Sequence, residues 1–274
     1  MRAGKSIAAG ATLFFVLKST RPFNRKIRER SRVSFGALPN GFSIGDAQTS
    51  ATGAAEFSER DNWLVWQLMD SAFPTGGFAH SSGLEAAWQH GEVRGREELI
   101  SFLEASLHQL GHASLPFVTA AFDAPEKLAE FDSLCDAFTS NHVASRASRA
   151  QGRAFLTAVE RIFKSEIRNS KFEIHFAHFA PVFGASLRWL EIRRETTLQM
   201  FFFNHLRGVL AAAVRLNIVG PMEAQMLQNQ LSPKAEAILI KCGSLSLDDI
   251  AQTAPLLDLW QGAQDRLYSR LFQS

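Results

Sequence analysis

The most informative stretch of the chain reads Asp70-Ser-Ala-Phe-Pro-Thr-Gly-Gly-Phe-Ala-His-Ser-Ser-Gly-Leu-Glu85. Pro74 fixes its own φ angle, whereas Gly76 and Gly77 permit backbone angles that other side chains forbid. We therefore expect a sharp turn followed by a helix. A hydroxyl from Ser81 or Ser82 is placed to cap the first free N–H groups of that helix.

This turn holds two aromatic side chains, Phe73 and Phe78, and one histidine, His80. Rigid loops that carry glycine and aromatic residues often form binding surfaces, because a fixed backbone presents their side chains in one geometry. A well-packed corner between two helices accounts for the same residues. Chemistry alone does not separate these two interpretations.

The same stretch resembles the N-terminal signature of the UreF family of urease accessory proteins, approximately Asp-Ser-x-x-Pro-x-Gly-x-aromatic-x-His-Ser-x-Gly-Leu-Glu. The last eight residues, Leu267-Tyr-Ser-Arg-Leu-Phe-Gln-Ser274, are similar to the family's Ser-Arg-Leu-aromatic-x-Ser ending. Further matching segments are 143–152, 180–184, 215–221 and 255–259. The Val-Gly-Pro and Pro-Leu-Leu-Asp sequences are more similar to those of plant-type members than to those of bacterial ones. The resemblance covers about residues 63–274.

Charge is distributed unevenly along the 274 residues. Residues 1–40 contain nine Lys and Arg residues against one acidic residue, so the remainder of the chain carries a net charge of −6 despite the overall value of +2. An acidic body argues against a nucleic-acid-binding surface, which requires a concentration of positive charge. With 46% hydrophobic residues the chain is long enough to bury a substantial core.

Residues 1–58 are interpreted as a disordered or targeting extension, and residues 59–274 as a single UreF-like helical domain. The apolar run from residue 7 to residue 17 is too short to span a bilayer as a helix. The Arg- and Ser-rich start of residues 1–40 leaves an organelle transit peptide open as an alternative to a cytoplasmic protein. Cys135 and Cys242 are widely spaced and are expected to be reduced thiols.

Apolar residues recur at helical spacing from residue 62 onward. One such stripe is Leu99, Phe102, Leu103, Leu107 and Leu110, and the longest runs from Leu198 to Val214. Because proline favours the first position of a helix, Pro221 and Pro233 predict one helix from Pro221 to Gln230 and another from Pro233 to Lys241. No convincing alternating β pattern is present. The predicted fold is therefore all-α, a single domain of roughly ten helices.

Histidine pairs offer the chain's only plausible catalytic pattern. His108 and His112 are separated by one helical turn, and His175 and His178 form a second pair. No H-E-x-x-H pattern, G-x-S-x-G motif or nucleotide-binding loop accompanies them. We therefore expect a protein without catalytic activity and without a cofactor of its own. A metal-dependent hydrolase that uses the two pairs remains the alternative, together with a helical adaptor unrelated to urease.

Two segments carry candidate interface residues. The run Met200-Phe-Phe-Phe203 fans around a helix, so it indicates either a partner surface or a central helix buried on all sides. The final segment combines Tyr268, Leu271 and Phe272 with Arg270, the residue types that interface hot spots favour. We expect this tail to become ordered on a partner, and packing against its own domain is the competing interpretation.

The resemblance implies a non-catalytic scaffold in urease maturation. UreF-like proteins form dimers, bind the accessory protein UreD (UreH in some organisms) and recruit the GTPase UreG. The assembly docks on apo-urease, and nickel and GTP are handled by the partner complex. Arg215 falls where the family carries a basic residue that acts toward the GTPase, by docking or as an arginine finger, and docking is preferred. Gln264-Asp265 replaces the His-Glu pair of many bacterial members.

These considerations give one set of candidate partner-binding residues and no membrane-binding, nucleic-acid-binding or metal-ligating ones. The set comprises Pro74, Gly76, Gly77, Phe78, His80, Ser81, Arg215, Tyr268, Arg270, Leu271 and Phe272.

Overall fold

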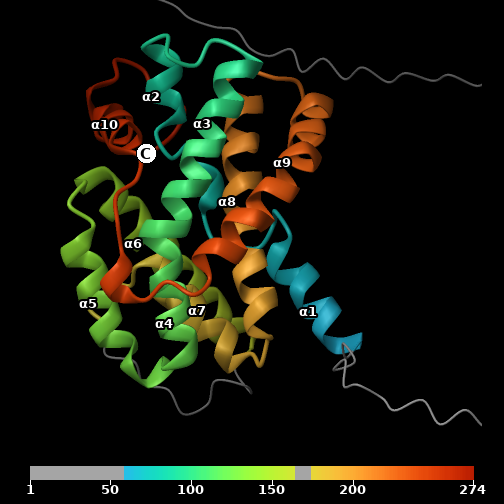
Figure 1. The fold of residues 1–274 in the computed structure, drawn as a ribbon, viewed down its shortest axis with the longest axis vertical. Helices are drawn as coiled ribbons and strands as arrows, with labels where there is room; N and C mark the ends of the chain where they lie inside the picture. Colours follow the sequence, from blue (N-terminus) through green and yellow to red (C-terminus); the bar gives the residue numbers. More distant parts are fainter. Residues whose placement is uncertain (1–58, 164–173) are drawn as a thin grey trace, which may run out of the picture. The chain divides into compact units, whose positions relative to one another are not determined.

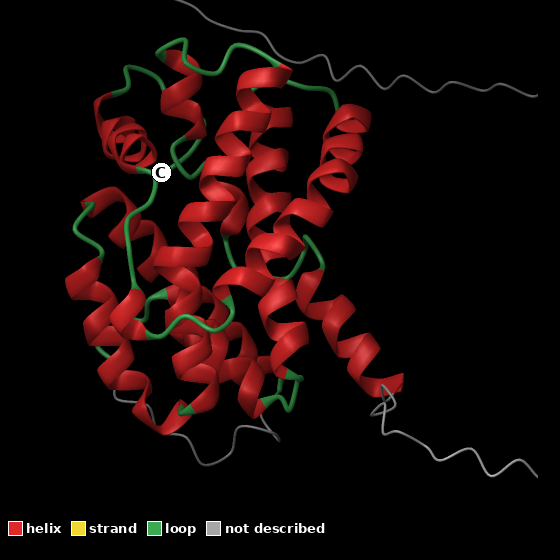
Figure 2. Ribbon diagram, in the orientation of Figure 1, coloured by secondary structure: helices red, strands yellow, loops and turns green. Residues whose placement is uncertain are grey.

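Every regular element in residues 59–163 and 174–274, the part of the chain that the computed structural model describes, is helical (Figure 2). The all-α prediction is thereby confirmed. The predicted extension of residues 1–58 lies outside the described residues, as does the segment 164–173. Within the described part, no helix is both long enough and apolar enough to cross a membrane.

Ten α-helices follow one another along the described residues (Figure 1). Their bounds are α1 Glu59–Met69, α2 Leu84–Gln89, α3 Arg96–Gln109, α4 Leu115–Asp123, α5 Leu128–Phe138, α6 His142–Ile162, α7 Phe179–Trp189, α8 Arg194–Arg215, α9 Pro221–Cys242 and α10 Pro255–Ala263. Short 3₁₀ segments η1 Gly77–Ala79, η3 Pro125–Lys127, η4 Leu247–Asp249 and η5 Gln264–Arg266 join some of them, and a π-helical turn, η2 Leu110–Ser114, joins α3 to α4.

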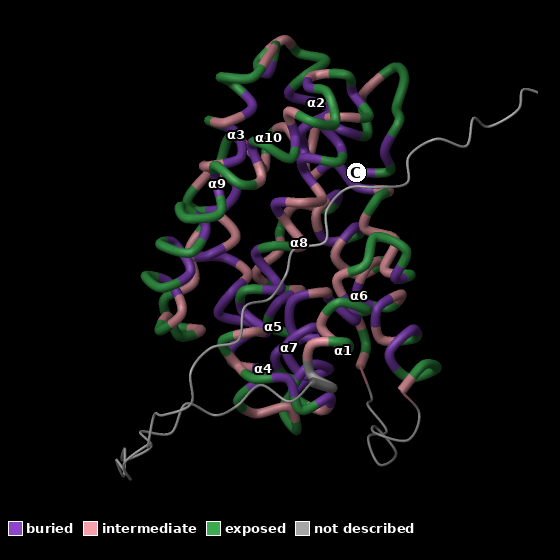
Figure 3. Tube along the Cα trace, turned by 90° about the vertical axis from the view of Figure 1, so that its right-hand side faces the viewer, coloured by how far each residue is buried: buried purple, intermediate pink, exposed green. Residues whose placement is uncertain are grey.

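Helix α8 lies at the centre of the fold and packs against α3, α4 and α9 (Figure 1). In the run Met200-Phe-Phe-Phe203, the first three side chains are buried and only Phe203 reaches the surface, where it is 42% exposed. A central helix surrounded by neighbours therefore explains three of the four residues. Buried positions follow the inward sides of the surrounding helices, as the purple segments of Figure 3 show.

Helix α9 corrects one prediction, because Pro233 lies inside a continuous helix from Pro221 to Cys242 rather than at the start of a second helix. A proline in this position removes one backbone hydrogen bond and costs roughly 3 kcal/mol. The ring of Pro233 faces solvent, whereas Leu231 and Ala235 on either side are buried. Burial of the inner face therefore holds the helix together across the proline.

Two glycines let α7 sit unusually close to its neighbours. A Cβ atom on Gly152 of α6 would lie 2.0 Å from the carbonyl oxygen of Ala177, just before α7. A Cβ atom on Gly184 of α7 itself would lie 2.2 Å from the carbonyl oxygen of Val118 in α4. No side chain fits at either position. This close approach helps to bury most of α7.

Candidate functional site

The turn between α1 and α2 has the sharp backbone that the sequence predicts, with one correction. Gly76 adopts the left-handed conformation with φ +69°, whereas Gly77 does not have a positive φ and instead begins the 3₁₀ segment η1. The hydroxyl of Ser81 accepts a hydrogen bond from the Glu85 backbone N–H, at 3.3 Å, in the first turn of α2. The N-cap residue of α2 is Gly83, which has no side-chain cap, so neither serine is the N-cap, and Ser81 satisfies only the free N–H of Glu85.

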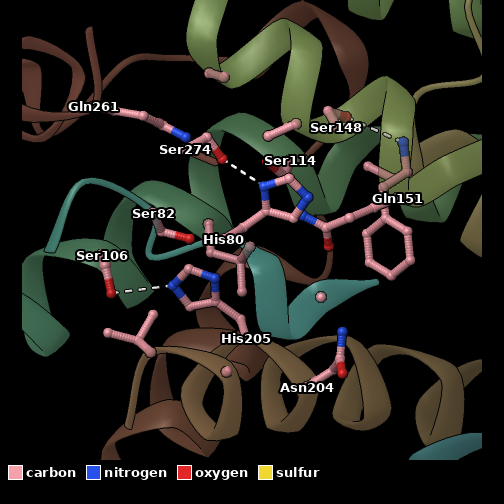
Figure 4. Close-up of a pocket in the computed structure, with 18 of the residues that line it drawn as sticks. His80, Ser82, Ser106, Ser114, Ser148, Gln151, Asn204, His205, Gln261 and Ser274 are labelled. Carbon is pink, nitrogen blue, oxygen red and sulfur yellow. Dashed lines mark hydrogen bonds between the residues drawn. The ribbon is translucent and has the colours of Figure 1, made fainter. Parts of the chain in front are cut away.

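The last residues of the chain return to this turn, so the expectation of a free tail is wrong. The N–H of Gln273 donates to the carbonyl oxygen of Ala79 at 2.8 Å, and the N–H of Ser81 donates to that of Ser274 at 2.5 Å. His80 Nδ1 lies 2.6 Å from the hydroxyl oxygen of Ser274 (Figure 4). The chain end lies between α2 and α10 in the ribbon of Figure 1, and near α2 in the tube of Figure 3. Packing against its own domain, the competing interpretation, describes the tail.

A buried carboxylate holds the tail from the side of α2. Glu85, only 1% exposed, accepts hydrogen bonds from the backbone N–H groups of Leu271 at 2.6 Å and Phe272 at 3.1 Å. The side-chain amide of Gln264 donates to the same carboxylate at 2.5 Å. A buried charge is tolerated only when such partners surround it. Gln264 therefore has a structural role.

Sequence reasoning missed Glu85 as a functional residue, although it ends the signature stretch. The available signal was a single acid among small and apolar residues, Leu84-Glu85-Ala86-Ala87, all of which are buried. A charge inside an apolar helix face requires a partner from another part of the chain. That requirement did not reveal that the partner would be the tail.

Arg215 joins the turn to the tail. Its guanidinium lies 4.2 Å from the ring centroid of Phe272 and donates a hydrogen bond to the carbonyl oxygen of Phe78. Phe272 is only 4% exposed, so this candidate partner-binding residue belongs to the core and not to the surface. His80 and Ser81 are buried as well, and each forms a hydrogen bond with Ser274.

Ion pairs fix the tail on its outer side. Asp265 of η5 accepts hydrogen bonds from Arg146 of α6 at 2.7 and 3.0 Å and from Arg270 at 3.0 Å. These hydrogen bonds and the positive charge of Arg146 lower the pKa of Asp265 to about 2. Burial, followed by the positive charge of Arg146, lowers the pKa of His80, so this imidazole stays neutral at pH 7.

Several candidate residues remain exposed around these buried contacts. Phe78 is 74% exposed and Leu271 is 59% exposed, while Tyr268 is fully exposed. Arg270 and Pro74 also face solvent. We refer to Phe78, Tyr268, Arg270 and Leu271 as the turn–tail surface. The turn and the tail, almost 200 residues apart in the chain, thus present large apolar side chains from one hydrogen-bonded unit.

The histidine pairs of the hydrolase hypothesis do not assemble into a site in the described residues. His178 is buried, with Nε2 2.9 Å from an Asp136 carboxylate oxygen and Nδ1 3.1 Å from the Ser148 hydroxyl. His112 Nδ1 lies 2.9 Å from the carbonyl oxygen of His108. Among these residues, no group of three or more His, Cys, Asp or Glu side chains is arranged to hold a metal ion. The geometry therefore gives this hypothesis no support.

A cavity of about 370 Å³ lies behind the turn. His80 and Ser274 contribute to its wall, together with His205 of α8 and Gln151 of α6 (Figure 4). Sequence reasoning did not anticipate this cavity. Its walls come from six helices and the tail, a combination that no local pattern in the sequence encodes.

Comparison with known proteins relates most of the chain to one family. The family model UreF matches residues 93–232. Urease accessory protein F of Arabidopsis thaliana is 40% identical over 223 residues, which cover 77% of this chain and 92% of that protein. Urease accessory protein F of Oryza sativa subsp. japonica is 38% identical over 231 residues, covering 81% and 88%. A urease accessory protein UreF-like protein of Schizosaccharomyces pombe is 30% identical over 234 residues, covering 79% and 99%.

Proposed function

Because the chain belongs to the UreF family of urease accessory proteins, we propose that it acts in urease maturation as a non-catalytic scaffold. On this proposal it binds UreD (UreH), and the two together recruit and regulate the GTPase UreG. The assembly then inserts nickel into apo-urease in a GTP-dependent step. Nickel and GTP belong to the partner complex, and the protein works in the cytoplasm as a homodimer within that complex.

The observation that carries the scaffold proposal is the turn–tail surface. Phe78, Tyr268 and Leu271 are large apolar side chains left exposed by a segment whose backbone is otherwise fixed. Exposed aromatic residues on a fixed backbone suit a protein interface, since little conformational entropy is lost when they bind. Arg270, which pairs with Asp265, is exposed on the same tail segment. We assign this surface to UreD.

The contacts of Arg215 favour a docking role over an arginine finger. Its guanidinium is already engaged with the ring of Phe272 and with the carbonyl oxygen of Phe78. To reach a bound nucleotide it would have to abandon both contacts, and the tail would lose a cation–π interaction worth roughly 0.5–2 kcal/mol. Arg215 therefore positions the turn and tail, and UreG responds to the surface that results.

The test of the proposed function is complementation in a urease-producing host that lacks its own UreF. Expression of this chain together with the matching UreD and UreG is expected to restore urease activity and the nickel content of purified urease. A chain that restores neither, although it is expressed and folded, would contradict the proposal. The metal content of purified urease distinguishes failed nickel insertion from a catalytic defect in urease itself.

A further inference from the structure

The cavity behind the turn has the size and lining of a site for a small organic molecule. Its volume of about 370 Å³ lies within the range of ligand pockets, roughly 300–1,000 Å³. Aromatic side chains form much of the apolar wall: Phe73, Phe138, Phe179 and Phe201. Phe73 and Phe201 are buried core residues, so this part of the wall is held rigidly by packing.

An unusual backbone segment shapes one side of the cavity. The π-helical turn η2 runs from Leu110 to Ser114, and Leu110, Ala113 and Ser114 all line the cavity. A π-helical turn inserts an extra residue into the helical repeat, and such turns occur frequently at functional sites. Here it continues α3, which lines the cavity through Ser106 and Gln109, and leads into α4.

His205 supplies an acceptor on the cavity wall. Its Nε2 lies 3.1 Å from the hydroxyl oxygen of Ser106, and that hydroxyl donates its single hydrogen to the carbonyl oxygen of Leu103 at 2.9 Å. With the Ser106 hydrogen directed at Leu103, we assign the histidine as the donor in its contact with Ser106, which places a hydrogen on Nε2. Burial lowers the pKa of His205 to about 4, so the ring is neutral at pH 7.

The second nitrogen of His205 is consequently a lone-pair acceptor. Nδ1 makes no hydrogen bond to any residue within the described ranges, and the ring stands at the cavity wall (Figure 4). Because no protein donor occupies this acceptor, a bound molecule that supplies an N–H or O–H group would be stabilised there by a hydrogen bond. The cavity therefore combines one hydrogen-bond acceptor with an aromatic wall.

The two arginines at the cavity are already engaged. Arg207 donates to the carbonyl oxygen of Met69, and Arg215 donates to that of Phe78. Asp258 also contributes to the wall, and burial raises the pKa of its carboxyl group. An anionic ligand would therefore lose its hydration without gaining a free cation as a partner, which is unfavourable. The raised pKa of Asp258 works against the carboxylate that a cationic ligand would need.

We propose that this cavity binds a small uncharged molecule that has an apolar ring and one hydrogen-bond donor, which His205 Nδ1 accepts. The aromatic wall contacts the ring, and the neutral imidazole selects for the donor. This site adjoins the turn–tail surface, because Phe78 also lines the cavity, together with His80 and Ser274. Binding here does not require the proposed function to hold.

The test compares phenol with toluene on the full-length chain. The two molecules have nearly the same size, but only phenol carries a donor. Titration followed through the imidazole nitrogen signals in NMR is expected to show saturable phenol binding, with a large shift of the His205 Nδ1 resonance. Phenol should bind about tenfold more tightly than toluene, the effect of one buried hydrogen bond.

His205→Gln is the matched variant, because its amide can still donate to Ser106 while the acceptor at the Nδ1 position is lost. This variant should bind phenol and toluene equally. Equal affinities for the wild-type chain, no saturable binding of phenol, or binding that leaves the His205 signals unchanged would each overturn the proposal. The wild-type comparison stands even where the variant fails to fold. A cavity filled by water alone gives the second of these results.

Discussion

At the scale of single residues, Glu85 determines where the tail lies. Three N–H donors from two parts of the chain converge on one buried carboxylate, and one of its oxygens receives two of them. A carboxylate is acceptor-only, so it satisfies all three without competition from a donor of its own. The identity of this residue as an acid therefore matters more than its size.

Replacement of Glu85 by glutamine tests this directly. The amide would turn an N–H₂ group toward one or more of the three donors, leaving buried groups unsatisfied. Glu85→Gln is expected to lower the free energy of unfolding by about 1–3 kcal/mol in urea denaturation. The exposed Glu92 gives a matched control, and Glu92→Gln should change stability by less than about 0.5 kcal/mol. Equal effects of the two substitutions would show that the carboxylate is not what holds the tail.

At the scale of elements, close backbone contacts fix how α4, α6 and α7 pack. Gly152 and Gly184 both occur in segments that resemble family motifs, and each stands where a carbonyl oxygen of a neighbouring segment leaves no room for a side chain. The hydrogen bonds of Asp132 complete the arrangement. This buried carboxylate accepts from the N–H groups of Phe176, Ala177 and His178 at the start of α7.

A pair of glycine substitutions tests the close contact. In Gly152→Ala the new Cβ would meet the carbonyl oxygen of Ala177, and because that atom belongs to the backbone it cannot move away cheaply. A loss of stability of at least about 1–3 kcal/mol is expected. Gly208 lies in α8 with nothing within 4 Å of an added Cβ. Gly208→Ala should therefore be neutral or stabilise the protein by up to about 1 kcal/mol. Similar thermal melting of the two variants would refute the packing argument.

The ion pairs between η5 and α6 predict a pH dependence. Asp265 has an ordinary pKa of 3.8 that the folded state lowers to about 2. A lowered carboxyl pKa contributes stability above the ordinary value, and this contribution is lost as pH falls from about 4 to about 2. Asp265 is solvent-accessible, so the contribution should not exceed about 1 kcal/mol. Melting temperatures between pH 5 and pH 2 should converge for the wild type and Asp265→Asn, and parallel curves would contradict the assignment.

Local patterns in the sequence predicted the helices better than the contacts between distant segments. The spacing of Leu99, Phe102 and Leu103 places α3 and its buried face correctly, because helical periodicity is a local property. Pro233 misled the prediction, since burial of the inner face of α9 outweighs the lost hydrogen bond. The apolar residues of the tail are visible in the sequence, and they led to the prediction that the tail becomes ordered on a partner. The sequence does not show that Glu85 and Arg215 contact Phe272 within the same domain.

At the scale of the whole molecule, the described domain divides its apolar residues between burial and display. Phe272 is inserted into the protein beneath Arg215, whereas Phe78, Tyr268 and Leu271 are left outside. If these four side chains served only to pack the core, all of them would be buried. The division is what a preformed interface requires, because the buried residue fixes the backbone and the exposed residues are free to contact a partner.

The most direct measurement is the affinity of purified UreD for the full-length chain and for a Phe78→Ser, Tyr268→Ser, Leu271→Ser triple variant. These side chains are exposed, so the variant should keep its circular dichroism spectrum and its melting temperature within a few degrees. A triple substitution at the exposed Met222, Met226 and Ile240 of α9 is the control, and it should bind UreD as the wild type does. The scaffold account predicts a loss of affinity of at least 100-fold for the turn–tail variant alone. Unchanged UreD binding by a folded turn–tail variant would contradict it.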